Sequence, residues 1–332
     1  MCTNLSFANR SHECPVISAR TMDFPVELTT FVRFIPRRQE FPETPKPEEM
    51  HWRNRYAFIG VAHTMPGLFV QAYSDGLNEA GLSAACLWLE GSEYPKPRSG
   101  VPILYNANLV SYILGSFRNI AETEEGLNQI TVVGISNPIE TPVHLVITDA
   151  SGNHLIVEYV AGEVKTYRSS TGVLTNEPTY DWHLTNLKNY VNLDLVNNPK
   201  KVDNGGELFG SGQLGSPGDP TSASRFIRAD LFSRSLFKPE SIQQSIGLAA
   251  QVIGTLAVPC GTEVASGPDP YYNWTQWVVI RDHTNCGFYF YSAFNSALYG
   301  IHLRELNPHA ADREEIDIIQ PNWYTNITGR FR

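Results

Sequence analysis

A cysteine occupies the second position of this 332-residue chain, directly after Met1. Removing Met1 alone would leave a free α-amine and a thiol on the same residue, Cys2. The ordinary pKa is about 7.7–8.0 for an α-amine and about 8.5 for a thiol, so Cys2 would combine a base and a nucleophile near neutral pH. The opening Met1-Cys2-Thr3 therefore predicts nucleophilic catalysis from a free terminus, with chance placement of the cysteine as the alternative.

Arg20 and Asp23 lie on the next predicted strand, residues 16–24, which a hairpin would fold back beside Cys2. A nearby arginine stabilises a thiolate, and a nearby carboxylate would hold the terminal ammonium group. An arginine and an aspartate three residues apart are also typical of an ordinary surface ion pair. The pair therefore gains its catalytic interpretation only from its expected neighbour, Cys2.

Two later segments carry side chains that could stabilise developing charge. Asn176 lies in a turn before a predicted helix, where its side-chain amide could donate to an oxyanion or simply cap the turn. Arg225 opens another predicted helix after a long loop, a position that faces a cleft as often as solvent. We expect His183 to be structural, because a terminal amine makes a second base unnecessary.

Composition excludes several classes of protein. Hydrophobic residues make up 42% and charged residues 18% of the chain, as in globular proteins, and no apolar run approaches the length of a membrane span. A formal net charge of −9 argues against nucleic-acid binding. The cysteines show neither metal-ligand spacing nor a disulfide pattern, so we expect no metal site: Cys2, Cys14, Cys86, Cys260 and Cys286.

Hydrophobic patterning predicts strands at both ends of the chain and helices between them. Strands are expected over 3–8, 16–24, 68–73, 82–89, 143–149, 154–160, 164–167, 275–281, 287–293 and 298–303. Helices are expected over 104–129, 179–191, 223–237 and 239–256, with Asn119 as a cap. A turn is expected over 75–81, and loops over 36–55 and 193–221. Because neither half closes a sheet alone, we expect one interleaved α+β domain.

Five segments, in this order, resemble the choloylglycine hydrolase family, which includes bile salt hydrolases and penicillin V acylases and belongs to the N-terminal nucleophile hydrolases: Cys2-Thr3, Arg20-Thr21-Met22-Asp23, Asp75-Gly76-Leu77-Asn78-Glu79-Ala80-Gly81-Leu82, the string from Gly172 to His183, and Ser224-Arg225-Phe226. The resemblance implies a four-layer αββα sandwich of two antiparallel sheets, formed by a single domain over residues 1–332. It also implies a homotetramer and a reaction that uses no metal or organic cofactor.

The resemblance also implies a role for each site residue. Cys2 would be the nucleophile after loss of Met1, with its own amine as the base. Arg20 would support the thiolate and Asp23 the amine. Asn176 would supply the side-chain donor of the oxyanion hole, and Arg225 would stabilise charge at the reacting centre.

The chain departs from the family at Trp88. Bile salt hydrolases of Gram-positive bacteria usually carry an asparagine there that contributes to the oxyanion hole, so the backbone N–H of Trp88 must serve or the hole must be rebuilt. An aromatic residue at this point is common in the branch rich in penicillin V acylases. Trp88 and Phe24 would then form an apolar wall for an aryl or acyl group, with plain core packing as the alternative.

The leading hypothesis is therefore an amidase with a small-molecule amide substrate. Phenoxyacetyl penicillins and acyl homoserine lactones are favoured, and conjugated bile salts are the alternative. A catalytically silent binding protein would result if Met1 stays attached, and a papain-like enzyme would use Cys86 or Cys260 with His183. We expect a cytoplasmic protein from the sequence as it stands, or a periplasmic one if Met1 replaces a removed signal peptide.

Overall fold

A computed structural model gives the fold, and it describes residues 1–7, 14–64, 72–135, 141–197, 200–201, 204–208, 210, 212–264, 266 and 271–331. Most of the strands belong to two antiparallel sheets. The smaller sheet has the order β1 (Cys2–Ser6), β2 (Ile17–Phe24), β16 (Trp274–Asp282), β17 (Gly287–Ser292), β18 (Asn295–His302). The larger has the order β13 (Glu163–Ser169), β12 (His154–Val160), β11 (Val143–Thr148), β8 (Ser83–Trp88), β7 (Ala72–Asn78), β6 (Phe58–Thr64), β3 (Thr29–Ile35), β19 (Glu314–Asp317).

The two ends of the chain meet in the smaller sheet. Strand β2 lies between β1 and β16, and the register places Thr275 of β16 opposite Asp23 and Met22 opposite Cys2. This pairing joins strands about 250 residues apart in the sequence. The smaller sheet therefore needs both halves of the chain, as expected, whereas seven of the eight strands of the larger sheet come from residues 29–169.

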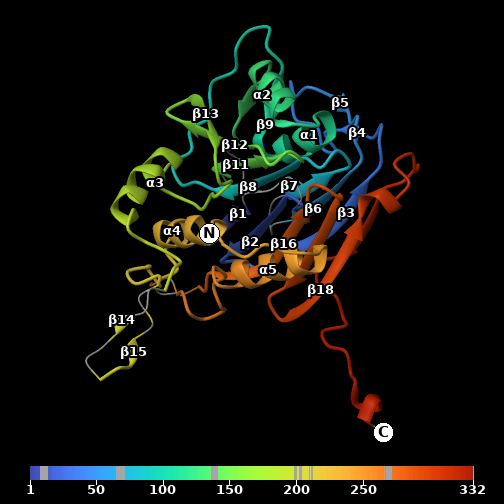
Figure 1. Cartoon of the computed structure of the whole chain (residues 1–332). Coiled ribbons are helices and arrows are strands. Elements are labelled where there is room, and N and C mark those ends of the chain that lie inside the picture. The colour runs from blue at the N-terminus through green and yellow to red at the C-terminus, as the bar shows by residue number, and fades with distance from the viewer. Residues whose placement is uncertain are drawn as a thin grey trace.

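Helices cover the outer faces of the two sheets (Figure 1). Helix α1 (Leu109–Ser116) packs on β6, β7 and β8, and α2 (Ile120–Asn128) adds apolar side chains to the same core. On the opposite side, α4 (Ser222–Ser233) packs on β1, and α5 (Ile242–Gly254) packs on β2 and β16. The expected αββα sandwich is confirmed. No helix in the described ranges combines the length and apolar character needed to cross a membrane.

The remaining elements are short. Helix α3 (Tyr180–Asn186) continues into a 3₁₀ turn, Leu187–Tyr190, and other 3₁₀ turns span Asn106–Asn108, Leu303–Glu305 and Thr328–Phe331. Two-stranded pairs are formed by β4 (Glu40–Phe41) with β5 (Trp52–Arg53), β9 (Ile103–Tyr105) with β10 (Thr131–Val133), and β14 (Lys200–Lys201) with β15 (Glu207–Leu208). The loops expected over 36–55 and 193–221 therefore each contain short strands.

The turn expected over 75–81 is wrong in its first half, because β7 continues through Asn78. Gly76 serves close packing here: a Cβ atom on it would lie 2.4 Å from the backbone oxygen of Ile59. Gly81, with φ of +81°, does form the turn. The strand expected over 68–73 falls largely outside the described residues.

Two other differences concern elements of the larger sheet and its helices. Strands β3, β6 and β19 were not predicted, although the apolar run of β6 is typical of a buried strand. The helix expected over 104–129 is two helices with a break at 117–119. That break has a local cause, because the side chain of Asn119 accepts a hydrogen bond from Glu122 N and starts α2 as its N-cap.

Candidate active site

Cys2 begins β1 with its side chain 3% exposed. Its Sγ lies 3.7 Å from Sδ of Met22, its partner in β2. Met1 continues the pairing by one residue: its amine donates to the backbone oxygen of Asp23 at 2.7 Å, and its carbonyl accepts from Asp23 N at 2.9 Å. Hairpin pairing of β1 with β2 therefore brings the thiol beside the side chains that the sequence singled out.

Arg20 approaches the sulfur directly. Its Nη2 lies 3.4 Å from Cys2 Sγ and donates at 2.8 Å to the backbone carbonyl of Cys86. Its Nη1 donates to the carbonyl of Ser74 at 3.1 Å, so the guanidinium spans the space between the two sheets. Its cationic carbon also lies 5.2 Å from the ring centre of Trp277. These contacts hold a positive charge next to the thiol.

Two further charged side chains surround Arg20. Asp75 lies 3.4 Å from both Arg20 and Arg281, and all three side chains are at most 1% exposed. The cluster contains the guanidinium groups of Arg20 and Arg281 but a single carboxyl group, that of Asp75. Its net charge is therefore positive whether Asp75 is ionised or protonated. Burial on its own would lower the pKa of Arg20, but the negative charges of Cys2 and Asp75 outweigh it and raise that pKa. The guanidinium is therefore permanently charged.

Asp23 lies on the same side of the nucleophile as the chain terminus. Its fully buried carboxylate accepts hydrogen bonds from the hydroxyl groups of Thr275 and Thr21, the second at 3.2 Å. The amine of Met1 contacts its backbone oxygen rather than its carboxylate. With Met1 attached, the expected ion pair between Asp23 and a terminal ammonium is therefore not formed.

Asn176 faces the backbone of Cys2. Its Oδ1 accepts from Cys2 N at 2.6 Å and from Arg225 Nη2 at 2.8 Å, and its Nδ2 donates to the carbonyl of Trp88 at 2.8 Å. Because two donors bind Oδ1, the orientation of the amide is fixed. One of the two Nδ2 hydrogens then remains for a further acceptor.

Arg225 is fully buried and contacts the nucleophile through its backbone. Its Nη1 donates to the carbonyl of Cys2 and to the hydroxyl of Thr3, and its Nε donates to Pro220 O at 2.7 Å. Burial lowers its pKa, although the Asp23 and Cys2 charges oppose that change. Arg225 thus acts on Cys2 and Asn176 from the side away from the sulfur.

Phe24 and Trp88 form an edge-to-face pair with ring centres 6.1 Å apart. Both line a cavity of about 90 Å³, partly open to solvent, together with Cys2 and Arg20. The other residues that line it are mostly apolar, among them Met22, Leu28, Leu87, Ile135 and Val143. An apolar group can therefore approach the thiol beside these two rings.

The described residues do not form a papain-like pair. The ring of His183 lies 3.0 Å from the carbonyl of Asn176 and stacks on Phe226, so it is occupied structurally. Burial raises the pKa of the Cys86 thiol to about 12, and Cys260 is exposed. Burial therefore disfavours the thiolate form of Cys86, and neither cysteine is hydrogen-bonded to His183 among the described residues.

Sequence analysis missed several residues of the site. Thr275, Arg281 and Met22 contact Asp23, Asp75 and Cys2 respectively. Arg281 and Thr275 come from the C-terminal part of the chain and reach the site only through sheet pairing. Arg281 still gave a signal, because a charged residue within an apolar strand points to a buried partner.

The sequence matches the model of one protein family over residues 2–317, described as linear amide C–N hydrolases of the choloylglycine hydrolase family. A penicillin V acylase of Pectobacterium atrosepticum is 27% identical over 99% of this chain and 88% of its own length. A bile salt hydrolase/transferase of Clostridium perfringens is 26% identical over 97% of both chains.

Solved structures share the fold. The C2A mutant of the conjugated bile acid hydrolase from Clostridium perfringens superposes with a TM-score of 0.81, at 24% identity over 96% of this chain and 97% of that one. A penicillin V acylase from Agrobacterium tumefaciens superposes with a TM-score of 0.79, at 25% identity over 95% and 91%.

Proposed function

The chain belongs to the choloylglycine hydrolase family of linear amide C–N hydrolases, and we propose that it cleaves its substrate through an acyl-enzyme on Cys2, after Met1 has been removed. The observation that carries this proposal is the contact between Cys2 Sγ and Arg20 Nη2, 3.4 Å apart and buried from water. We further propose that residues 1–332 act as one domain and that four copies assemble, as the family resemblance implies.

In the first half of the reaction, the Cys2 thiolate forms a C–S bond to the carbonyl carbon of the amide, and the carbonyl electron pair moves to oxygen. The tetrahedral intermediate collapses as the C–N bond breaks, and the leaving nitrogen takes a proton from the ammonium group of Cys2. In the second half, the α-amine of Cys2, now neutral, accepts a proton from water. The water oxygen forms a bond to the acyl carbon, and the C–S bond breaks. The products are an amine and a carboxylic acid, and the thiolate is restored.

The surrounding side chains supply the electrostatics of these steps. Arg20, with the positive excess of its cluster, favours the thiolate. The free Nδ2 hydrogen of Asn176 supports the oxyanion, because its amide is already held by Arg225 and by the carbonyl of Trp88. Asp23 supports the new amine once loss of Met1 frees its backbone oxygen and exposes Cys2 N.

For the substrate we propose a phenoxyacetyl amide such as penicillin V. The paired rings of Phe24 and Trp88 beside the thiol support a flat aryl acyl group, and the relative from Pectobacterium atrosepticum is named penicillin V acylase. Conjugated bile salts are the second candidate, because the mostly apolar cavity also suits a steroid and the Clostridium perfringens relative is named for bile salts. Acyl homoserine lactones are a third.

A panel of penicillin V, benzylpenicillin, glycocholate, taurocholate and a long-chain acyl homoserine lactone tests this proposal. We expect the highest kcat/KM for penicillin V, an intact mass that lacks Met1, and no turnover by Cys2→Ala. Cys86→Ala is the matched control, since it removes the other thiol that lines the same cavity. Wild-type rates in Cys2→Ala would exclude the mechanism, while a preference for bile salts would exclude only the proposed substrate.

A further inference from the structure

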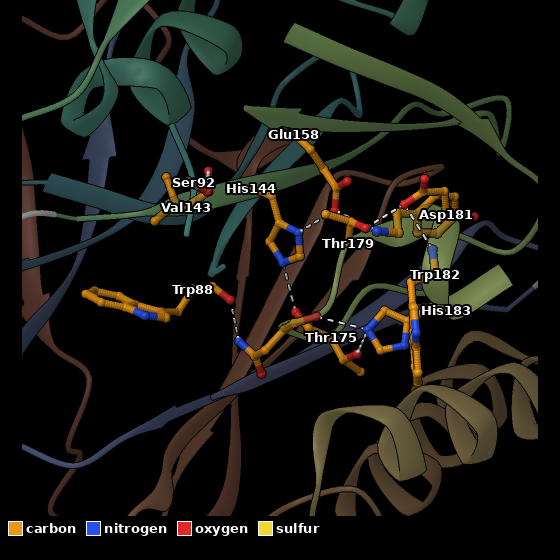
Figure 2. Close-up of polar contacts among 12 residues, drawn as sticks. Trp88, Ser92, Val143, His144, Glu158, Thr175, Thr179, Asp181, Trp182 and His183 are labelled. Carbon is orange, nitrogen blue, oxygen red and sulfur yellow. Dashed lines mark hydrogen bonds and ion pairs between the residues drawn. The ribbon is translucent and has the colours of Figure 1, made fainter. Parts of the chain in front are cut away.

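Two buried histidines bind consecutive backbone carbonyls beside the candidate oxyanion site. Nε2 of His144 lies 3.0 Å from the carbonyl oxygen of Thr175, and Nε2 of His183 lies 3.0 Å from that of Asn176. Ser222 completes the set, because its hydroxyl accepts from Asn176 N at 3.0 Å. Thus three successive backbone polar groups of this turn are bound by side chains. Figure 2 shows the two imidazole rings on either side of Thr175.

Glu158 holds His144 from the other side. His144 is on β11 and Glu158 on the neighbouring strand β12, and both side chains are 0% exposed. Nδ1 of His144 lies 3.0 Å from Oε1 of Glu158, which also accepts from Tyr180 N at the start of α3. The same helix carries His183. Two chains of hydrogen bonds therefore run from α3 to the Thr175–Asn176 backbone, one through Glu158 and His144 and one through His183.

The geometry also fixes a proton in this network. A carbonyl oxygen only accepts, so Nε2 of His144 carries a hydrogen toward Thr175. A neutral ring would then present a lone pair at Nδ1, and a carboxylate opposite would present another. The 3.0 Å contact with Glu158 therefore requires one proton between the two groups, on the ring or on the carboxyl. This proton joins the two buried side chains through Oε1 of Glu158, while Oε2 of the same carboxyl has no hydrogen-bond partner among the described residues.

We propose that His144 and Glu158 are positioning residues that fix the Thr175–Asn176 backbone, so that the Asn176 amide stays aligned with Cys2 during catalysis. Neither lines the cavity within the described ranges, and the link to the reaction runs through Asn176, whose Oδ1 accepts from Cys2 N at 2.6 Å. A displacement of about 1 Å at such a donor can cost about 10²-fold in rate. This inference rests on the function proposed above for Asn176.

The test measures kcat and KM with penicillin V and glycocholate for His144→Leu, His144→Gln and Glu158→Gln. We expect His144→Leu to lower kcat at least about 10-fold with KM changed less than about threefold. His144→Gln should recover part of the loss, because its amide can still donate to the Thr175 carbonyl. His154→Asn is the matched control: His154 is buried on β12, the strand that carries Glu158, and bonds Thr148 away from the site, so the kcat of this variant should stay near that of the wild type.

A double variant separates this inference from the proposed function. If His144 acts through Asn176, adding His144→Leu to Asn176→Ala should lower kcat no further than about twofold. Additive losses, or an unchanged kcat in a folded His144→Leu protein, would overturn the positioning role. If His144→Leu does not fold, His144→Gln and Glu158→Gln are each combined with Asn176→Ala instead, and the same comparison of kcat values tests the positioning role. An unchanged kcat in Asn176→Ala alone would instead contradict the oxyanion role of Asn176.

Discussion

The side-chain amide of Asn176 donates a hydrogen bond of 2.8 Å to the backbone carbonyl of Trp88. Trp88 therefore contributes to the site through its main chain, which orients the amide, while its ring lines the cavity and donates its indole N–H to Glu90 at 2.9 Å. The same amide is held on its oxygen by Cys2 N and Arg225.

Asn176→Ala should lower kcat by about 10²–10³-fold, the usual loss for one oxyanion donor, with a much smaller change in KM. Steady-state kinetics on penicillin V and glycocholate would check this. Loss of the amide also leaves the carbonyl of Trp88 without that donor, so thermal unfolding should be measured alongside. A raised KM with an unchanged kcat would show that Asn176 binds the ground-state substrate instead.

Arg20→Gln should reduce the thiolate fraction of Cys2, because it removes the charge 3.4 Å from the sulfur. Alkylation of the protein by iodoacetamide should then require a higher pH, and kcat/KM should fall over the same range. Arg37→Gln, which breaks an ion pair with Glu79 away from the site, is the control. Identical alkylation profiles for Arg20→Gln and wild type would contradict the role of Arg20.

Thr275→Val should weaken both stability and turnover, because it removes a hydroxyl donor from the buried carboxylate of Asp23. A hydrogen bond to a charged group contributes about 1.5–3 kcal/mol, so we expect a loss of that order in unfolding free energy. Thr275→Ser keeps the hydroxyl and should stay close to wild type. Urea unfolding and kcat measured on both variants would check this. Equal unfolding free energies and equal kcat values for the two variants would show that the hydroxyl group of Thr275 does not stabilise the Asp23 carboxylate.

Acid should destabilise the fold through buried neutral histidines. Burial lowers the pKa of His154 to about 4 and that of His283 to about 3, whereas an unfolded histidine has a pKa of about 6.5. Below about pH 6.5 the unfolded chain binds more protons than the folded chain, so the free energy of unfolding decreases as the pH is lowered. At pH 5 each of these histidines should have lowered it by about 2 kcal/mol relative to neutral pH. Below the folded pKa values this dependence ends.

His283→Asn checks the sign of this effect. The variant loses hydrogen bonds to Ser18 and Gly81 and should be less stable at pH 7.5, but its stability should depend less steeply on pH between 7.5 and 5.5. Urea unfolding at several pH values measures the slope. If unfolding free energy depends on pH as steeply in the variant as in the wild type, groups other than His283 cause the acid sensitivity.

The substrate wall can be tested on its two rings. Phe24→Leu and Trp88→Leu should each lower kcat/KM for penicillin V by about 2- to 13-fold beyond the loss from burial, since an aromatic contact contributes about 0.5–1.5 kcal/mol. Turnover of glycocholate, which has no aryl group, should fall less. Equal losses on both substrates would mean that the rings serve as general apolar packing.

Sequence alone determined much of this protein. Strand alternation and the β1–β2 hairpin placed Arg20 and Asp23 beside Cys2, because antiparallel pairing of nearby segments is a local consequence of pattern and turn. The motifs gave the family, and with it the layered fold. Asn119 as a helix cap was readable for the same local reason.

Only the tertiary structure decided which distant residues complete the site. Thr275 and Arg281 reach Asp23 and Asp75 through the pairing of β16 with β2, whose register depends on the whole sheet and not on local pattern. Gly76 was mistaken for a turn residue because the sequence does not show that another backbone passes within van der Waals contact. The burial that holds His144 against Glu158 likewise arises only when two sheets and a helix pack together, since protonation and hydrogen bonding there depend on exclusion of water.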